Sequence, residues 1–115
     1  GKKIKAKNIT YLQKGKKVAF IMDTVLVPEC YDAAEDADVL VSEATYAKDM
    51  EEKAAEYLHL TSEQAAQIAK KSKAKELWLT HTSQRYENIP QVILGEAKKV
   101  FKNTHLAEDL MRIEI

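Results

Sequence analysis

The chain has 115 residues with 18 basic and 18 acidic side chains, so its formal net charge is zero. That length allows a single domain with one hydrophobic core, and the neutral charge by itself predicts neither a nucleic-acid nor a membrane partner. Cys30 is the only cysteine, which excludes an internal disulfide and a zinc ribbon and suits a reducing cytoplasm. No apolar stretch is long enough to span a membrane and no signal-peptide pattern is evident, so we expect a cytoplasmic protein without a membrane partner.

The amino-terminal end is rich in lysine and predicts strands. Loose alternation over residues 3–12 is followed by turn residues at 13–16, and residues 17–22 are a nearly continuous apolar run. Together these segments predict a β-hairpin leading into a buried strand. The lysines allow two interpretations: they follow a phosphate backbone, or they are the charged edges of a solvated hairpin. They are Lys2, Lys3, Lys5, Lys7, Lys14, Lys16 and Lys17.

The middle of the chain alternates helices with strands. Pro28 suits the first turn of a short helix over 29–36. Residues 38–42 form a second buried strand that ends at Glu43, and residues 47–57 contain helix formers. Thr61 begins a helix, because Gln64 three residues later fits a capping box. A narrow stripe of small residues predicts that this helix packs closely against a sheet; the stripe is Ala65, Ala66, Ile68 and Ala69.

The carboxyl-terminal part continues the alternation. A strand over 76–80 is followed by a helix that Pro90 opens, with an apolar stripe of Val92, Ile93, Ala97, Val100 and Phe101. Residues 110–115 alternate strictly and predict a half-exposed last strand. Strands that alternate with helices indicate an α/β layered fold. Because the chain has no repeat and no internal linker, we expect residues 1–115 to form one compact unit.

Three of the predicted strands end at ionisable residues, namely Asp23, Glu43 and His81. In an α/β sheet the carboxyl ends of the strands line the crevice where ligands bind, so these groups are expected to converge. An aspartate and a histidine are a suitable pair of ligands for zinc or manganese, which predicts a metal-dependent hydrolase. Zinc in an enzyme normally has at least three protein ligands, so these two residues do not complete a site.

Structural interpretations stay open for the same residues. Asp23, followed by Thr24, can cap the next turn, and Glu43 can be the acid that initiates a helix. Solvated or purely structural interpretations also exist for His59, His105, Arg85 and Tyr86.

Four short motifs follow one another along the chain: Asp-Thr at 23–24, Ser-Glu-Ala-Thr-Tyr at 42–46, His-Leu-Thr-Ser-Glu-Gln-Ala-Ala at 59–66 and Leu-Thr-His-Thr-Ser-Gln-Arg-Tyr at 79–86. In this order and spacing they resemble motifs of ribonuclease Z, the tRNA 3′-processing endonuclease of the metallo-β-lactamase superfamily. Residues 107–110 also resemble the end of that family. The resemblance implies half of an αββα sandwich, with a mixed β-sheet and helices packed on one face. It also implies cleavage of precursor tRNA at its 3′ side.

The resemblance assigns roles to individual residues. Asp23 would bridge two zinc ions, and His81 would be a terminal ligand of one of them. His59 would lie beside the scissile phosphate as a proton donor or transition-state stabiliser, held by a hydrogen bond to Glu43. The full-length enzyme would be a homodimer. The residues that would hold phosphates of the tRNA are Arg85, Thr82 and Ser83.

Several parts of the family pattern are missing from this sequence. The motif His-x-His-x-Asp-His, a further histidine ligand before Asp23 and the protruding arm that grips tRNA are all absent, and the chain begins with Gly1. We therefore expect a carboxyl-terminal half that alone is inactive and holds metal weakly. Two alternatives are another hydrolase of the superfamily and a receiver-type signalling domain with Asp23 as phospho-acceptor and Thr80 as switch residue. A receiver needs an acidic pair on its first strand and a lysine after a later one, and neither is evident.

Overall fold

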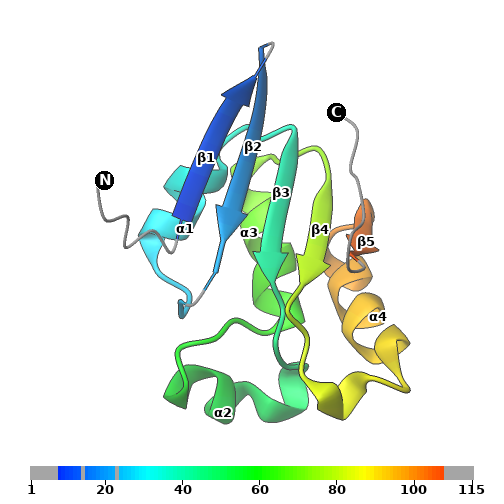
Figure 1. Ribbon diagram of the computed structural model, residues 1–115. Coiled ribbons are helices and arrows are strands. Elements are labelled where there is room, and N and C mark those ends of the chain that lie inside the picture. The colour runs from blue at the N-terminus through cyan, green and yellow to red at the C-terminus, as the bar shows by residue number, and fades with distance from the viewer. Residues whose placement is uncertain (1–7, 14, 23, 108–115) are drawn as a thin grey trace.

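The computed structural model describes residues 8–13, 15–22 and 24–107, and its centre is a five-stranded sheet (Figure 1). The strands are β1 (Asn8–Gln13), β2 (Lys16–Ile21), β3 (Val39–Glu43), β4 (Leu77–Thr80) and β5 (Thr104–Leu106), and they lie side by side in chain order. The α-helices are α1 (Pro28–Ala34), α2 (Glu51–Glu56), α3 (Ser62–Ser72) and α4 (Pro90–Val100), and the 3-10 helices are η1 (Lys48–Met50) and η2 (Gln84–Tyr86). The predicted α/β class is confirmed.

The amino-terminal strands form the β-hairpin that the sequence predicted. β1 runs antiparallel to β2, with pairs from Asn8↔Ile21 to Gln13↔Lys16. Gly15 has a φ of +75°, a conformation that glycine adopts without steric cost, which lets the chain reverse tightly at this point. Residues 1–7 and Lys14 lie outside the described residues, so the interpretation of most of the lysines stays open.

The other strands place the candidate functional residues at one edge of the sheet. β2, β3, β4 and β5 are parallel to one another, so their carboxyl ends meet at the same edge. In the register of β3 and β4, Glu43 pairs with Thr80, the residue immediately before His81. The two strand ends therefore bring Glu43 and His81 to neighbouring positions, as the sequence predicted.

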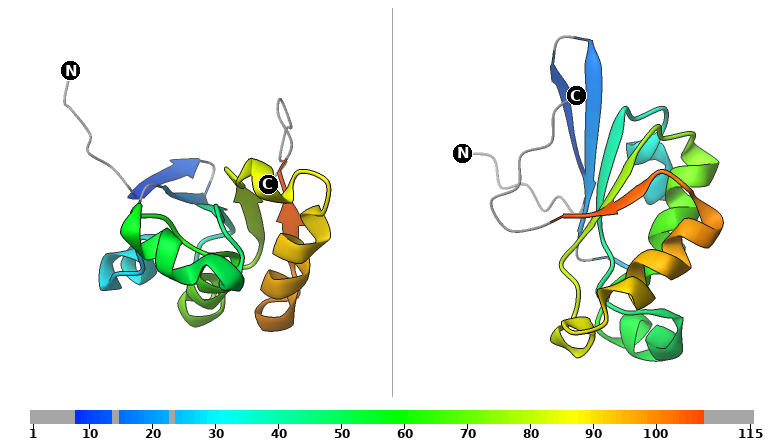
Figure 2. Two further views of the ribbon diagram at one scale, coloured as in Figure 1. Left: turned by 90° about the horizontal axis from the view of Figure 1, so that it is seen from below. Right: turned by 90° about the vertical axis from the view of Figure 1, so that its right-hand side faces the viewer.

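Helices α1, α3 and α4 cover one face of the sheet (Figure 2). The predicted stripe of α3 is fully buried against it, because alanines at these positions let the helix backbone approach the strands closely. The facing strand residues are large and aliphatic, among them Leu40, Leu77 and Leu79, each with no exposed surface. Among the described residues no helix is both long and apolar enough to cross a bilayer.

The opposite face of the sheet is also apolar, although no helix within the described residues covers it (Figure 2). Val39 and Val41 of the central strand lie on it, because alternate residues of a strand point to opposite faces. Trp78 of β4 stacks on the ring of His105 in β5, with 4.6 Å between the ring centroids. A sheet with apolar side chains on both faces fits one half of a sandwich.

Some predicted boundaries differ from the structure. The helix expected over 29–36 ends at Ala34, and the helix expected over 47–57 is the 3-10 helix η1 followed by the short α2. His105 lies within the three-residue strand β5, which was not predicted from the sequence. That strand was missed because three residues are too few for an alternation pattern. The strand predicted over 110–115 lies outside the described residues.

Candidate active site

Glu43 is a buried carboxylate at the carboxyl end of β3. Its side chain is only 1% exposed. The oxygen Oε2 accepts hydrogen bonds from the backbone N–H of Leu60 at 3.0 Å and from the hydroxyl of Thr45 at 3.2 Å, and it lies 2.8 Å from His59 Nδ1. A buried charge is tolerated when its oxygens accept bonds in this way. Glu43 is therefore fixed in place, and because it ends β3 while the next helix begins only at Lys48, the interpretation of Glu43 as a helix-initiating acid is wrong.

The turn that precedes His59 fixes the position of its imidazole. After α2, Leu58 adopts a left-handed φ of +60°, and the N–H groups of Leu58 and His59 donate to the carbonyls of Ala55 and Ala54. These two bonds form a Schellman motif, which satisfies the last carbonyls of a helix and usually has glycine where Leu58 stands. The Schellman motif holds the backbone of His59, and Glu43 holds its Nδ1. The imidazole ring therefore has little freedom to turn.

Helix α3 begins shortly after His59, as predicted. The Thr61 hydroxyl accepts from the N–H of Gln64 at 3.2 Å, and the Gln64 side chain accepts from the N–H of Thr61 at 3.0 Å. This capping box satisfies two donors at the helix start and contributes about 1 kcal/mol. The cap predicted from the sequence is confirmed, and it anchors the chain on the carboxyl-terminal side of His59.

His81 follows the last residue of β4 and is exposed. Its φ is +57°, which is uncommon for a residue with a Cβ, and such conformations cluster at functional positions. The rings of His59 and His81 lie with their centroids 6.1 Å apart. The structure thus brings together the two histidines that the motifs singled out, although they are far apart in the sequence.

Residues 44–47 form a connecting segment between the loops that carry the two histidines. Toward the His59 loop, Thr45 N–H donates to the carbonyl of Leu60 and Ser62 N–H donates to the carbonyl of Tyr46. Toward the His81 loop, Ala44 N–H donates to the carbonyl of Thr80, and Ser83 N–H donates to the carbonyl of Thr45. These backbone bonds connect the His59 loop to the His81 loop.

Tyr86 could be an ordinary surface residue according to one interpretation of the sequence, and this interpretation is wrong. Its side chain is 3% exposed, and its hydroxyl accepts from the N–H of Ala47 and donates to Asp49 Oδ1, both at 2.9 Å. Burial raises the pKa of this hydroxyl above its usual value.

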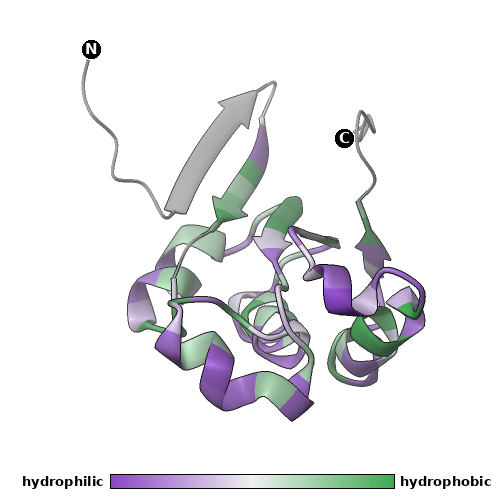
Figure 3. Ribbon diagram, turned by 60° about the horizontal axis from the view of Figure 1, so that its bottom comes forward, coloured by the Kyte–Doolittle hydropathy of each residue, from purple (hydrophilic) through white to green (hydrophobic). Residues whose placement is uncertain are grey.

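The residues predicted to hold phosphates lie in the same loop as His81. Thr82 and Arg85 are exposed, whereas Ser83 is half-buried and its hydroxyl accepts from the N–H of Arg85 at 3.3 Å as it caps η2. Figure 3 shows strongly hydrophilic residues around η2 and along α2, at the edge of the sheet where the site lies. An exposed arginine there is suited to bind phosphate oxygens.

The described residues do not complete a metal site. Among them there is no group of three or more histidine, cysteine, aspartate or glutamate side chains that could hold a metal ion. Asp23, the second predicted ligand, lies outside the described residues. His81 is therefore the one predicted ligand whose surroundings are known, and its single imidazole does not define a metal centre.

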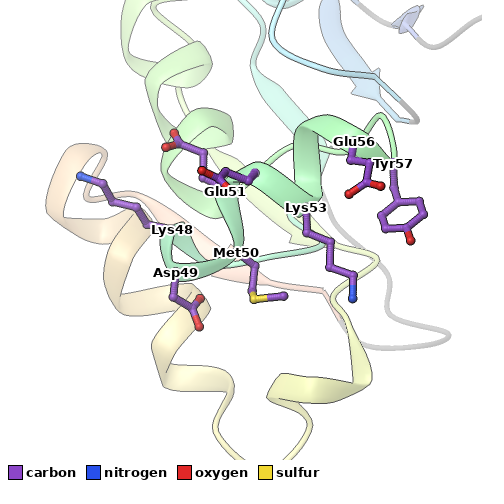
Figure 4. A pocket seen from close by; sticks show the side chains of 8 residues that line it. Lys48, Asp49, Met50, Glu51, Lys53, Glu56 and Tyr57 are labelled. Atoms are coloured by element: carbon purple, nitrogen blue, oxygen red, sulfur yellow. The ribbon is translucent and has the colours of Figure 1, made fainter.

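A hollow of about 620 Å³ lies beside the site, around η1 and α2 (Figure 4). Neither histidine of the site lines it, and neither does Glu43. Its side chains include four carboxylates and two ammonium groups, a balance that does not favour a polyanionic ligand. The lining residues are Lys48, Asp49, Met50, Glu51, Glu52, Lys53, Glu56 and Tyr57.

The geometry places groups that can exchange protons at one edge of the sheet. A carboxylate-bound imidazole lies beside a second imidazole, at the carboxyl edge of a mainly parallel sheet. The profile of the family described as "Beta-lactamase superfamily domain" matches residues 6–82. The chain belongs to this family, which excludes the receiver-type alternative.

Within the family, the chain is similar to ribonuclease Z, and the resemblance is confirmed. It is 46% identical over 99 residues to the "Ribonuclease Z" of Bacillus thuringiensis (strain Al Hakam) and, to the same extent, to that of Bacillus cereus (strain AH187). These matches cover 85% of this chain and 32% of each relative, so the chain spans about a third of the length of these relatives.

Two solved structures have a similar fold. The metallo-beta-lactamase fold protein YhfI from Bacillus subtilis superposes with a TM-score of 0.79 and 26% identity, over 88% of this chain and 40% of that protein. The human tRNase Z, short form, gives a TM-score of 0.71 and 34% identity, over 92% of this chain and 37% of that protein. The predicted fold class, half of a metallo-β-lactamase sandwich, is confirmed.

Proposed function

We propose that this chain is the carboxyl-terminal part of a longer, metal-dependent endoribonuclease that cleaves precursor tRNA at its 3′ side. Two lines of support agree: the similarity to proteins named ribonuclease Z and tRNase Z, and a site whose groups suit phosphodiester hydrolysis. The observation that carries the proposal is the contact between His59 and Glu43 beside the His81 ring.

We propose that His59 is the catalytic acid or transition-state stabiliser. An ionised carboxylate only accepts hydrogen bonds, so Glu43 places the Nδ1 hydrogen between the two residues and leaves Nε2 for the substrate. A protonated imidazole then offers an N–H at Nε2 to a phosphate oxygen or to the leaving oxygen of a phosphodiester. The buried carboxylate accepts a hydrogen bond from Nδ1 and holds the ring in one orientation.

We propose that His81 and Asp23 are metal ligands and that Thr82, Ser83 and Arg85 bind phosphates. The exposed position of His81 at a strand end supports the first assignment, and the exposed Arg85 supports the second. Zinc is the proposed metal, because imidazole and carboxylate groups, together with water, are its usual ligands in enzymes. A pair of bound zinc ions would lower the pKa of a water molecule and stabilise the attacking and leaving oxygens of the phosphodiester. The remaining ligands would come from the rest of a longer protein.

The apolar face opposite the helices supports the proposal that a second sheet covers this half. Homodimerisation and a cytoplasmic location, the first implied by the resemblance and the second expected from the sequence, stay predictions.

The test compares the 115-residue chain with a longer protein that contains it. We expect the longer protein to cleave precursor tRNA at the trailer and to hold stoichiometric zinc, and the shorter chain to do neither. Gel analysis of cleaved precursor tRNA and elemental analysis measure these properties. Tight stoichiometric zinc on the shorter chain, or no cleavage by the longer protein, would contradict the proposal.

A further inference from the structure

The loop that carries His81 has little regular structure of its own. Residues 81–83 belong to no helix or strand, and His81 has a left-handed φ of +57°. Its position relative to His59 therefore depends on the bonds that join this loop to the connecting segment, residues 44–47. Backbone bonds at Ala44 and Ser83 join them, and a side-chain bond at the hydroxyl of Tyr86 does so as well.

The hydroxyl of Tyr86 donates one hydrogen bond and accepts another. Its hydrogen is donated to Asp49 Oδ1 at 2.9 Å, which leaves an oxygen lone pair to accept the N–H of Ala47, also at 2.9 Å. Asp49 is exposed and acts only as an acceptor when it is ionised, so it favours this orientation of the hydroxyl. The Tyr86 ring belongs to the hydrophobic core, which fixes the direction in which the hydroxyl points.

Backbone hydrogen bonds link the anchored Tyr86 to the His81 loop. Tyr86 N–H donates to the carbonyl of Ser83 at 3.0 Å, and Ser83 N–H donates to the carbonyl of Thr45 at 2.9 Å. Hydrogen bonds at Ser83 and Tyr86 thus hold the short path from the core-anchored ring toward His81. The same connecting segment begins directly after Glu43, which holds His59.

We propose that Tyr86 is a positioning residue that sets the distance between His81 and His59. Its hydroxyl holds the His81 loop against the connecting segment that follows Glu43, so the two imidazoles keep their spacing, with 6.1 Å between their centroids. The role of this spacing in turnover rests on the proposed function, whereas the positioning itself does not. Without the hydroxyl, Ala47 N–H loses its acceptor, and only the backbone bonds at Ala44 and Ser83 still hold the loop against the segment.

The test uses the full-length protein with the substitution Tyr86→Phe, which removes only the hydroxyl. Tyr31→Phe is the matched control: Tyr31 lies on α1, and the ammonium group of Lys71 lies over its ring at 5.7 Å from the centroid, away from the site. Turnover and KM are measured on precursor tRNA well below the melting temperature of each variant. In parallel, NMR spectra record the ring signals of the two site histidines.

We expect Tyr86→Phe to lower kcat on the order of ten-fold, because a displacement of about 1 Å at a reacting group can cost up to about a hundred-fold. KM should change far less, the ring signals of His81 should shift, and Tyr31→Phe should match the wild type in all three properties. A lower melting temperature with unchanged kcat and unchanged His81 signals would overturn the proposal, since a purely structural tyrosine predicts that result.

Asp49→Ala is a second variant in case Tyr86→Phe does not fold. It removes the acceptor of the hydroxyl and leaves the ring in the core, so we expect the same changes to a smaller extent. Unchanged His81 signals in this variant would also count against the proposal. If the wild type cleaves no precursor tRNA but Tyr86→Phe shifts the His81 signals, the proposed function fails and the positioning role stands.

Discussion

His59 Nδ1 lies 2.8 Å from Glu43 Oε2, and the Glu43 side chain is 1% exposed. The pair joins residues 16 positions apart and connects the end of β3 to the turn before α3. Since Leu60 N–H and the Thr45 hydroxyl donate to the same oxygen, the carboxylate is positioned before any substrate arrives. Preorganised groups of this kind need no rearrangement as charge develops in a transition state.

Glu43→Gln should impair catalysis more than folding. Glutamine keeps an oxygen that accepts hydrogen bonds but lacks the charge that strengthens the bond to His59 Nδ1 and orients the ring, so kcat should fall by about 10- to 100-fold. Glu43→Ala leaves the Leu60 N–H without its acceptor in the protein interior, which costs about 1–3 kcal/mol. Cleavage assays and urea unfolding of both variants measure these effects. A Glu43→Gln enzyme with wild-type kcat would contradict the role of the pair.

Leu58→Gly should raise the free energy of unfolding by about 1 kcal/mol, because glycine avoids the cost of a left-handed conformation. Leu58 is 53% exposed, so only part of its side chain loses burial, and Leu58→Ala loses most of the same contacts. Urea unfolding is the measurement. Leu58→Ala keeps the strained φ and serves as the control, and it should not gain stability. A glycine variant no more stable than the alanine variant would show that the strain is not released.

The Asp38 carboxylate should stabilise the folded protein at neutral pH, and this contribution should be lost in acid. The backbone N–H of Lys17 at 2.8 Å, and secondarily the ammonium of Lys75, hold the pKa of this carboxyl below its ordinary value of 3.8. A pKa that is lower in the folded state adds stability above 3.8, and this stability is lost as the pH falls through the folded-state pKa.

The melting temperature of Asp38→Asn, compared with the wild type between about pH 7 and about pH 2, tests this expectation. The melting temperatures of Asp38→Asn and the wild type should differ most at neutral pH and should become equal in acid. Asp32→Asn, at an exposed position of α1, is the control and should follow the wild type. A constant gap between Asp38→Asn and the wild type at every pH would refute the assignment.

Cys30 should resist thiol reagents in the folded protein. Its side chain has no exposed surface, and burial raises the pKa of the thiol above its usual value, so little of the reactive thiolate forms. Labelling with a maleimide, followed by mass-spectrometric mapping, should find Cys30 unmodified in buffer and modified in denaturant. Rapid labelling in buffer would mean that α1 does not pack as described.

The sequence predicted the features that depend on local patterns. Alternation and the Thr61 capping box defined the hairpin and the start of α3. The strand ends predicted that Glu43 and His81 are neighbours, and the resemblance to ribonuclease Z implied the contact of His59 with Glu43. The position of Tyr86 could not be predicted in the same way, because its partners Ala47 and Asp49 are 39 and 37 positions away and carry no motif. The left-handed conformation of Leu58 could not be predicted either, because this conformation usually has glycine and not leucine.

The most direct measurement is turnover together with zinc content for His59→Ala and His81→Ala in the full-length protein. We predict that His59→Ala lowers the rate of precursor tRNA cleavage by about 10² to 10⁴-fold while its zinc content stays at the wild-type level. His81→Ala should lose zinc. Equal loss of zinc from both variants, or wild-type cleavage by His59→Ala, would contradict the roles proposed for the two histidines.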